Sequence, residues 1–284
     1  MTKHPKHGER GQLLTVAYVM SFDIRWLACD VKVGNVTGFP PEAGPVAGPA
    51  LVSVRDADGD SADDLEWARV SVERLGDASP WRTFRWHKGQ KHFPGFYWSA
   101  TMSDHVIYES RLELARLLYA DFDQTVKSIV AQPFLMKAQV AGQTRRHVPD
   151  FFLLKDGGPV VVDVKPRDRL RKEKIAFTLA WSRAMVEDRG WEYEVWSEPP
   201  EAEVANLRML AGYRRNWLFD HRLLDTLIAA DFVGARLRDV PAAVDGWPRR
   251  LVWSHLLHLI WIHAYSVDLS TVLSGDHVLS RAAS

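Results

Sequence analysis

Cysteine is almost absent from this 284-residue sequence, in which Cys29 is the single example. One thiol excludes an intramolecular disulfide framework and any zinc site made of several thiolates, and it fits a protein of the reducing cytoplasm. Long apolar runs are missing as well, since the stretches at residues 13–20 and 259–262 are far too short to cross a bilayer. We therefore expect a cytoplasmic protein with no signal peptide and no membrane partner.

The sequence also lacks an excess of charge of either sign, because Lys+Arg and Asp+Glu both total 36. A nucleic-acid partner is therefore not indicated by the net charge and has to be sought in local basic clusters. Hydrophobic residues make up 46% of the chain and include 12 tryptophans. This composition is typical of a soluble globular protein that buries a sizeable core.

The middle of the chain alternates helical and extended patterns. The first helix of this block is predicted to be capped by Ser103 or Asp104, and the extended segment that follows it is interrupted at Pro133. Such an order indicates an α/β fold in which a mixed sheet is flanked by helices. The predicted elements are a helix at 103–123, extended segments at 126–140 and 191–198, a hairpin at 147–166, and one long amphipathic helix at 167–190 that ends at Gly190.

The two ends of the chain show different patterns. Three helices are predicted within residues 201–265, and a short strand pair within residues 265–280. Helices followed by a small hairpin favour a winged-helix-like module. Toward the N-terminus we expect strands within 13–33, a loop at 38–50, a strand at 51–55 and a helix at 63–75.

Charged residues stand on both strands of the hairpin at 147–166. Side chains alternate between the two faces of a strand, so Asp163 and Lys165 point to the same side. With the turn at residues 156–158, Asp150 lies near Lys165 if the strands pair in simple register. Two carboxylates repel each other unless a proton or cation lies between them, and an oxygen-ligated Mg²⁺ or Mn²⁺ is the natural solution. An isolated Asp-x-Lys is common, however, and on its own indicates a surface salt bridge.

The order of the surrounding segments carries a family resemblance. Residues 108–136 and 147–166 resemble the N-terminal catalytic domain of TnsA, the endonuclease subunit of heteromeric Tn7-like transposases, which belongs to the PD-(D/E)xK or restriction-endonuclease-like superfamily. The family motif consists of a helix glutamate, the Asp of a Pro-Asp pair, an acidic or amide residue, a spacer and a lysine. Its positions correspond here to Glu113, Asp150, Asp163 and Lys165, and Glu109 is the alternative glutamate because it lies four residues away on the same helix face.

The resemblance implies a function and a set of partners. A domain of this family would hydrolyse double-stranded DNA with Mg²⁺, for which Mn²⁺ substitutes, bound by Glu113, Asp150 and Asp163. Lys165 would orient the water or stabilise the transition state. The family implies cleavage at the 5′ ends of a mobile element, beside a DDE transposase and an AAA+ ATPase regulator. The expected organisation is the nuclease domain at 81–198 and a winged-helix-like domain at 199–284, preceded by an N-terminal extension of unknown role at 1–80 that the resemblance does not cover.

Two alternatives remain for the function. The chain could be a stand-alone nuclease of defence or plasmid maintenance, or a DNA-binding or assembly module whose nuclease fold is inactive. Intact acidic and lysine positions argue against the inactive module.

Basic residues cluster on both sides of the hairpin. Contact with a phosphate backbone beside the cleavage site and a solvated helix face explain this cluster about equally well. The C-terminal histidines His255, His258 and His263 stand among Leu and Trp without cysteine partners, which is more typical of core positions than of a zinc site. The residues expected to contact DNA are Arg145, Arg146, Arg167, Arg169, Arg171 and Lys172, with 213–217 and 248–250 as further places for DNA or partner contacts.

Overall fold

The computed structural model describes residues 46–82 and 93–281, which all lie in the larger of the two units into which the chain divides, residues 30–282. The strands predicted within 13–33, together with Cys29, fall outside the described residues. No helix in the described ranges has the length and apolar character needed to span a bilayer.

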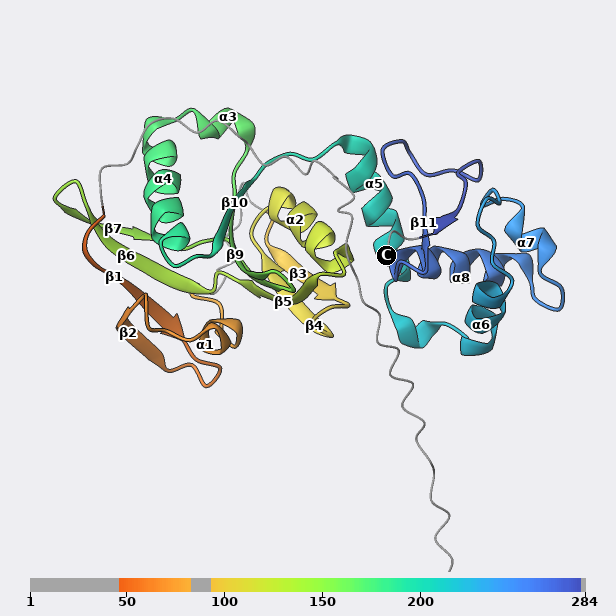
Figure 1. Cartoon of the computed structure of the whole chain (residues 1–284), viewed down its shortest axis with the longest axis horizontal. Helices are drawn as coiled ribbons and strands as arrows, with labels where there is room; N and C mark the ends of the chain where they lie inside the picture. Colours follow the sequence, from red (N-terminus) through yellow and green to blue (C-terminus); the bar gives the residue numbers. More distant parts are fainter. Residues whose placement is uncertain (1–45, 83–92, 282–284) are drawn as a thin grey trace, which may run out of the picture. The chain divides into compact units, whose positions relative to one another are not determined.

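Two four-stranded sheets form the framework of the first part of the described chain, up to residue 196 (Figure 1). One is antiparallel with the strand order β2-β1-β6-β7, and the other is mixed with the order β10-β9-β8-β5. A separate strand pair, β3-β4, precedes the first long helix. The strands are Val46–Arg55 (β1), Ser61–Glu66 (β2), Gly95–Ser99 (β3), Asp104–Tyr108 (β4), Val126–Ala131 (β5), Phe134–Val140 (β6), Gln143–His147 (β7), Phe151–Lys155 (β8), Gly158–Val164 (β9) and Glu192–Trp196 (β10).

The two sheets are linked by one long, kinked hairpin. Strands β5 and β6 are separated only by Gln132 and Pro133, and their partners β7 and β8 are separated by residues 148–150. Proline cannot donate a ladder hydrogen bond, and Gln132 has a positive φ of 46°, so the pairing changes direction here. The backbone amide of Gln132 still donates to the Asp150 carbonyl oxygen across the kink (2.9 Å). The extended pattern with its interruption at Pro133 is confirmed, and the kink places Asp150.

Strand β9 lies between two neighbours in the mixed sheet. It pairs antiparallel with β8, from Phe151 opposite Val162 to Lys155 opposite Gly158, so the predicted hairpin and its tight turn are confirmed. On its other edge β9 runs parallel to β10. Alternate β9 residues therefore face opposite sides of the sheet, and both sides are covered.

Helices α2 and α4 cover opposite faces of this sheet. Val160 and Val162 pack in the same apolar cluster as Leu117 of α2, whereas Val161 packs with Trp181 of α4. The observed mixed sheet between helices confirms the predicted α/β class. The helices of this part are Val72–Gly76 (α1), Arg111–Phe122 (α2), Arg167–Leu170 (α3) and Glu173–Glu187 (α4).

The predicted start of the helix at 103–123 is wrong. Residues 104–108 form β4, which pairs with β3, and α2 begins at Arg111 with Ser110 as its N-cap. Val106 and Ile107 are β-branched and fit a pleated strand as well as a helix, so apolar spacing alone does not separate the two. Ser103, one of the predicted caps, instead has a positive φ of 51° in the β3-β4 turn.

Two other helix predictions need correction. The predicted helix at 63–75 is the end of β2 followed by α1, which Ser71 caps through its side chain. The predicted helix at 167–190 is broken after Leu170 into α3 and α4. Leu170 and Ala176 are both buried, but in one continuous helix their side chains would point about 120° apart. The break allows both residues to reach the core.

The segment before residue 80 is not separate from the two four-stranded sheets. The strand predicted at 51–55 is confirmed, but β1 already begins at Val46, within the predicted loop at 38–50. It pairs with β6 through a register shift between Ala47 and Leu51, near Gly48, whose φ is +78°. Residues 46–66 thus extend the antiparallel sheet.

The C-terminal part contains the three predicted helices and the predicted strand pair. Its buried residues, such as Leu207, Leu223 and Leu256, belong to the same apolar cluster as Leu117 of α2. A winged-helix-like arrangement of these elements stays a prediction. The elements are Glu201–Leu210 (α5), His221–Ala229 (α6), Val240–Ala243 (α7), Arg249–Trp261 (α8), Tyr265–Ser266 (β11) and Ser280–Arg281 (β12), with short 3₁₀ turns at Ala211–Tyr213 and Asn216–Leu218.

Candidate active site

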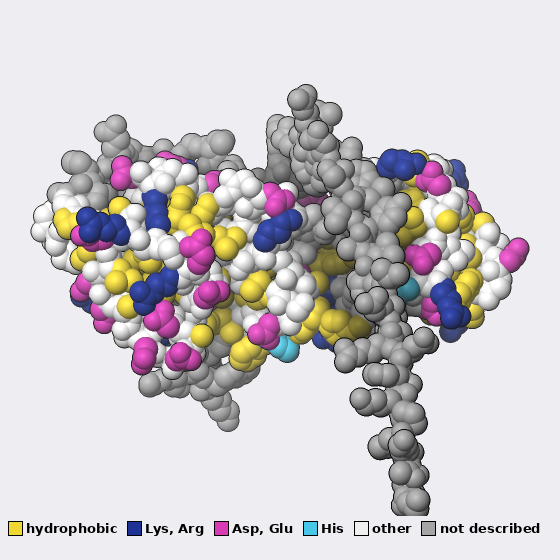
Figure 2. Space-filling model, turned by 60° about the horizontal axis from the view of Figure 1, so that its bottom comes forward, with side chains coloured by type: hydrophobic (Ala, Val, Ile, Leu, Met, Phe, Trp, Pro, Cys, Tyr) yellow, Lys and Arg dark blue, Asp and Glu magenta, His cyan; other side chains and the backbone are white. Residues whose placement is uncertain are grey.

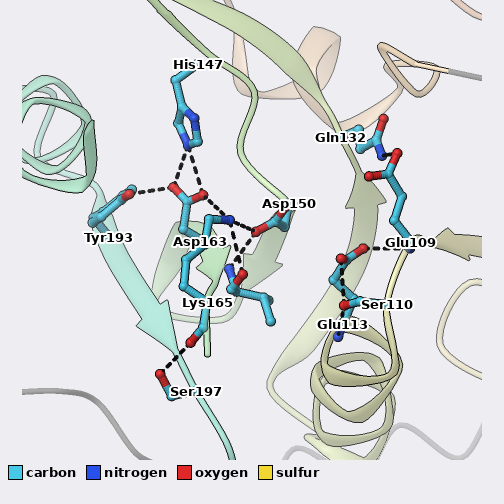
Figure 3. Close-up of polar contacts among 11 residues, drawn as sticks. Glu109, Ser110, Glu113, Gln132, His147, Asp150, Asp163, Lys165, Tyr193 and Ser197 are labelled. Carbon is cyan, nitrogen blue, oxygen red and sulfur yellow. Dashed lines mark hydrogen bonds and ion pairs between the residues drawn. The ribbon is translucent and has the colours of Figure 1, made fainter. Parts of the chain in front are cut away.

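The four residues of the predicted motif come together at one end of the mixed sheet (Figure 3). Glu113 lies on the first turn of α2, and Asp150 lies at the kink that precedes β8. Asp163 and Lys165 lie at the end of β9. In Figure 3, Asp150 is placed between Glu113 on one side and the Asp163–Lys165 pair on the other.

Asp150 and Lys165 form the central ion pair of this group. The Lys165 Nζ atom lies 2.7 Å from Asp150 Oδ2, and the Val164 backbone amide donates to the same oxygen (2.6 Å). The two side chains are 21% and 25% exposed, so the pair remains accessible from solvent. Burial raises the pKa of Asp150 above its ordinary value, and the charge of Lys165 acts in the opposite direction.

Lys165 is held by several further contacts. Its Nζ atom also donates to the Val164 carbonyl (3.1 Å) and to Asp163 Oδ1 (3.4 Å). Its backbone amide donates to the Trp196 carbonyl, and the Ser197 hydroxyl donates to its carbonyl. Burial lowers the pKa of Lys165, but the charges of Asp150 and Asp163 raise it more, so the amine remains a cation.

Asp163 is completely buried, and protein groups surround its carboxylate. The His147 Nε2 atom lies 2.8 Å from both carboxylate oxygens, and the Tyr193 hydroxyl donates to Oδ2. Burial alone would raise the pKa of Asp163, but His147 and Lys165 hold it well below its usual range. The carboxylate is therefore ionised without contact with solvent.

Glu113 takes part in the cap of its own helix. Ser110 accepts a hydrogen bond from the Glu113 amide (3.1 Å) and donates its hydroxyl hydrogen to Glu113 Oε1 (2.8 Å). The Glu109 amide donates to Glu113 Oε2 (2.7 Å), which resembles the reciprocal contacts of a capping box. Burial raises the pKa of Glu113 to about 7, and the charge of Asp150 adds to the shift.

Glu109, the alternative glutamate, has a different neighbour. Its Oε1 atom accepts a hydrogen bond from Gln132 Nε2 (2.7 Å), at the kink between β5 and β6. The backbone amide of the same Gln132 donates to the Asp150 carbonyl oxygen. Glu109 is thus tied to the backbone that carries Asp150, whereas Glu113 lies within electrostatic reach of the Asp150 carboxylate.

His147 and Tyr193 are site residues that the sequence patterns do not predict. His147 ends β7, three residues before Asp150, and its ring meets Trp181 of α4 edge-on. Tyr193 is the second residue of β10 and lies opposite Val161 in the parallel pairing. The alternation of β10 could have placed Tyr193 on the α4 side of the sheet, but no sequence signal indicated its contact with Asp163.

The predicted basic residues are placed in different surroundings. Arg145 lies over the ring of Phe177, and its Nε atom has no hydrogen-bond partner among the described residues. Arg167 contacts the side chain and carbonyl of Glu198. The remaining ones, Arg146, Arg169, Arg171 and Lys172, are exposed. On the face shown in Figure 2, Lys and Arg side chains lie in small groups among Asp and Glu side chains.

The C-terminal histidines serve the structure of that region. His258 is buried, stacks on Phe219 and contacts the Tyr213 carbonyl. His255 is buried too, and its Nε2 atom accepts from the Asp220 amide. His263 contacts the Phe122 carbonyl. The prediction that they are core or edge residues is confirmed.

The carboxylates of Glu113 and Asp150 fit a bound divalent cation. Burial raises the pKa of both carboxyl groups, and the negative charge of Asp150 raises that of Glu113 further, so a cation bound beside them would favour their ionised forms. Across residues 46–82 and 93–281, no three His, Cys, Asp or Glu side chains are grouped as a metal centre. Mg²⁺ commonly uses one or two carboxylates and completes its coordination with water and substrate phosphate. Two carboxylates are therefore a sufficient set.

The raised pKa of Glu113 predicts a stability effect. The ionised form of Glu113 disfavours folding. The free energy of unfolding therefore falls as the pH rises from the ordinary pKa of 4.5 to about 7. Glu113→Gln keeps an acceptor for the Glu109 amide, and the Ser110 hydroxyl can accept from the new side-chain NH2 instead of donating, so we expect the substitution to raise the free energy of unfolding by about 1–3 kcal/mol at pH 8. The gain should vanish at pH 4. Urea denaturation at both pH values measures this gain, with Glu192→Gln, at the exposed first residue of β10, as the control. Equal stability of wild type and Glu113→Gln at pH 8 would contradict the raised pKa of Glu113.

A comparison with protein families agrees with this geometry. Residues 123–198 match the family described as TnsA-like endonuclease N terminal. The match contains Asp150, Asp163 and Lys165 and begins just after α2, which carries Glu113. No curated protein matches the chain. The resemblance predicted from the sequence is confirmed, and it is confirmed for residues 123–198, which are similar to the N-terminal domain of TnsA-like endonucleases.

Proposed function

We propose that this chain is a metal-dependent endonuclease that hydrolyses phosphodiester bonds of double-stranded DNA. The observation that carries the proposal is the solvent-accessible Asp150–Lys165 ion pair next to Glu113, with Asp150 and Lys165 inside the segment that matches TnsA-like endonucleases. An ion pair with a purely structural role would not need a second carboxylate nearby whose negative charge repels that of Asp150. The intact pair also argues against an inactive assembly module.

Glu113 and Asp150 would hold Mg²⁺, with Mn²⁺ as a substitute. When bound, such an ion makes a coordinated water more acidic and neutralises charge on the phosphate. Asp150 is positioned for this role by its backbone, since its amide donates to the Val162 carbonyl and its carbonyl accepts from Gln132. The Val164 amide fixes Oδ2 of the same residue. The carboxylate is therefore preorganised rather than free to rotate.

Lys165 would act on the phosphate directly. Its amine is cationic and reaches the accessible end of the sheet beside Asp150. A fixed ammonium group stabilises the negative charge that develops on phosphate oxygens in the transition state. It also offers a donor that can orient the attacking water.

Exposed basic residues next to this end of the sheet would contact the DNA backbone. Arg169 on α3, with Arg171 and Lys172 in the break before α4, directly follows the strand that carries Lys165. Contacts of this kind position a duplex without reading its sequence. The family suggests cleavage at the 5′ ends of a mobile element, beside a DDE transposase and an AAA+ ATPase regulator.

Cleavage of supercoiled plasmid tests the proposed activity. Wild-type protein with Mg²⁺ or Mn²⁺, alone or with transposase subunits encoded nearby, is expected to nick or linearise the DNA. Asp150→Ala should lower the rate at least about 100-fold, because losing a metal ligand removes several kcal/mol of transition-state stabilisation. Asp156→Ala, in the exposed turn of the same hairpin, is the control and should cut normally. An inert wild type, or an Asp150→Ala variant that cuts equally well, would refute the proposal.

A further inference from the structure

Protein donors contact both oxygens of the Asp163 carboxylate. A carboxylate offers about four lone-pair positions, and three donor groups share them here. His147 Nε2 contacts both oxygens at 2.8 Å, Lys165 Nζ contacts Oδ1 and the Tyr193 hydroxyl contacts Oδ2. The side chain is also 0% exposed. A metal ion at Asp163 would have to displace one of these donors in a space closed to solvent.

Glu113 and Asp150 differ from Asp163 in this respect. Among the described residues, Asp150 accepts hydrogen bonds through Oδ2 only, and 21% of its side chain is exposed. Each oxygen of Glu113 accepts one hydrogen bond, from Ser110 or from the Glu109 amide. Glu113 and Asp150 therefore keep unused lone pairs, and in Figure 3 both residues lie on the opposite side of Asp163 from Tyr193.

Three separate elements hold Asp163 in place. His147 comes from β7, Tyr193 comes from β10, and α4 closes the site through Trp181, whose ring lies 6.2 Å from that of His147. Rigid strands and a packed helix fix the carboxylate, and Asp163 in turn touches the Lys165 amine. His147 and Tyr193 therefore contact Asp163, and Asp163 contacts the Lys165 amine rather than solvent.

We propose that Asp163 is a positioning residue that orients Lys165 and does not bind metal, and that His147 and Tyr193 hold Asp163 for this purpose. This assignment rests on the proposed nuclease function and departs from the expectation that Asp163 is a third metal ligand. It leaves Glu113 and Asp150 as the metal-binding carboxylates. It also makes His147 and Tyr193 part of the machinery that aligns the lysine.

The test separates metal affinity from the rate of cleavage. Mn²⁺ is titrated calorimetrically into the full-length chain without DNA, and single-turnover plasmid cleavage is measured at saturating Mn²⁺. Asp163→Asn is expected to bind Mn²⁺ within about threefold of wild type and to cleave about 10- to 100-fold more slowly, as losses of supporting contacts do. Asp150→Asn should weaken Mn²⁺ binding more than about tenfold. Comparable weakening by Asp163→Asn would overturn the proposal.

Tyr193→Phe provides a second variant that keeps the shape of the core. It removes the hydroxyl donor to Asp163 alone, so we expect a cleavage rate about 3- to 10-fold lower with an unchanged Mn²⁺ affinity. The neighbouring Glu192→Gln, whose side chain is exposed, should change neither quantity. A wild-type rate in Tyr193→Phe, or a weakened Mn²⁺ affinity, would count against the positioning role even if Asp163→Asn failed to fold.

The two measurements also distinguish this inference from the proposed function. If wild-type protein binds Mn²⁺ but does not cut DNA, the nuclease proposal fails, and the affinities of Asp163→Asn and Asp150→Asn still decide which carboxylate holds the ion. If wild-type protein does not bind Mn²⁺ at all, both proposals are refuted.

Discussion

Lys165→Met is expected to lower the rate of DNA cleavage by about 100- to 1,000-fold at saturating Mg²⁺. The substitution keeps the length of the side chain but removes the cation that lies 2.7 Å from Asp150 and 3.4 Å from Asp163. Removing one preorganised charge-stabilising group from an active site commonly costs this much. Single-turnover cleavage of plasmid measures the effect.

Lys165→Met should affect the binding of Mn²⁺ differently from the rate of DNA cleavage. The loss of a positive charge next to Asp150 does not weaken its attraction for a cation, so we expect Lys165→Met to bind Mn²⁺ at least as tightly as wild type. Lys155→Met is the matched control, because Lys155 is also a partly exposed lysine of this hairpin in an ion pair, with Asp123 at 2.9 Å. A Lys165→Met variant that cuts within about threefold of wild type would exclude a role for this lysine in catalysis.

Asp121→Ala is expected to cause a large loss of stability. Asp121 is a buried carboxylate near the end of α2 and accepts hydrogen bonds from the Tyr97 and Ser99 hydroxyls and from the amides of Ala100 and Thr101. Its removal leaves four donors in and after β3 without their acceptor. We expect the free energy of unfolding to fall by about 3–5 kcal/mol, since unsatisfied buried groups each cost about 1–3 kcal/mol and partly relax.

Urea denaturation of the full-length chain measures this loss through the midpoint of unfolding. Asp104→Ala is the control, because Asp104 begins the neighbouring strand β4 and is exposed. It should stay within about 0.5 kcal/mol of wild type. A loss below about 1 kcal/mol in Asp121→Ala would mean that the four donors find other acceptors or water.

The position of the central ion pair could be predicted from the sequence. Strand alternation places Asp163 and Lys165 on one side, and a tight turn in simple register brings Asp150 next to Lys165. In the observed register Phe151 lies opposite Val162, so Asp150 comes opposite Asp163, and the Lys165 side chain, two residues further along, reaches Asp150. The interruption at Pro133 could also be predicted, because proline has no backbone N–H to donate to a neighbouring strand.

The surroundings of Asp163 could not be predicted in the same way. His147 and Tyr193 lie 16 and 30 residues away in the sequence and reach Asp163 through the packing of β7 and β10. The break between α3 and α4 likewise depends on where Leu170 and Ala176 meet the core. The helix start at Ser110 was missed because Val106 and Ile107 fit the apolar spacing of a helix, while their pairing with β3 is a tertiary contact.

Dependence of plasmid cleavage on Mg²⁺ is the most direct measurement of whether Glu113 and Asp150 form a metal-dependent nuclease site. We predict that wild-type protein cuts supercoiled plasmid as Mg²⁺ is added and stops in EDTA. Glu113→Gln, which folds at least as stably, should need more than about tenfold higher Mg²⁺ for half-maximal rate or should not cut at all. Cleavage that persists in EDTA, or a Glu113→Gln variant with the Mg²⁺ dependence of wild type, would contradict a metal site at these two carboxylates.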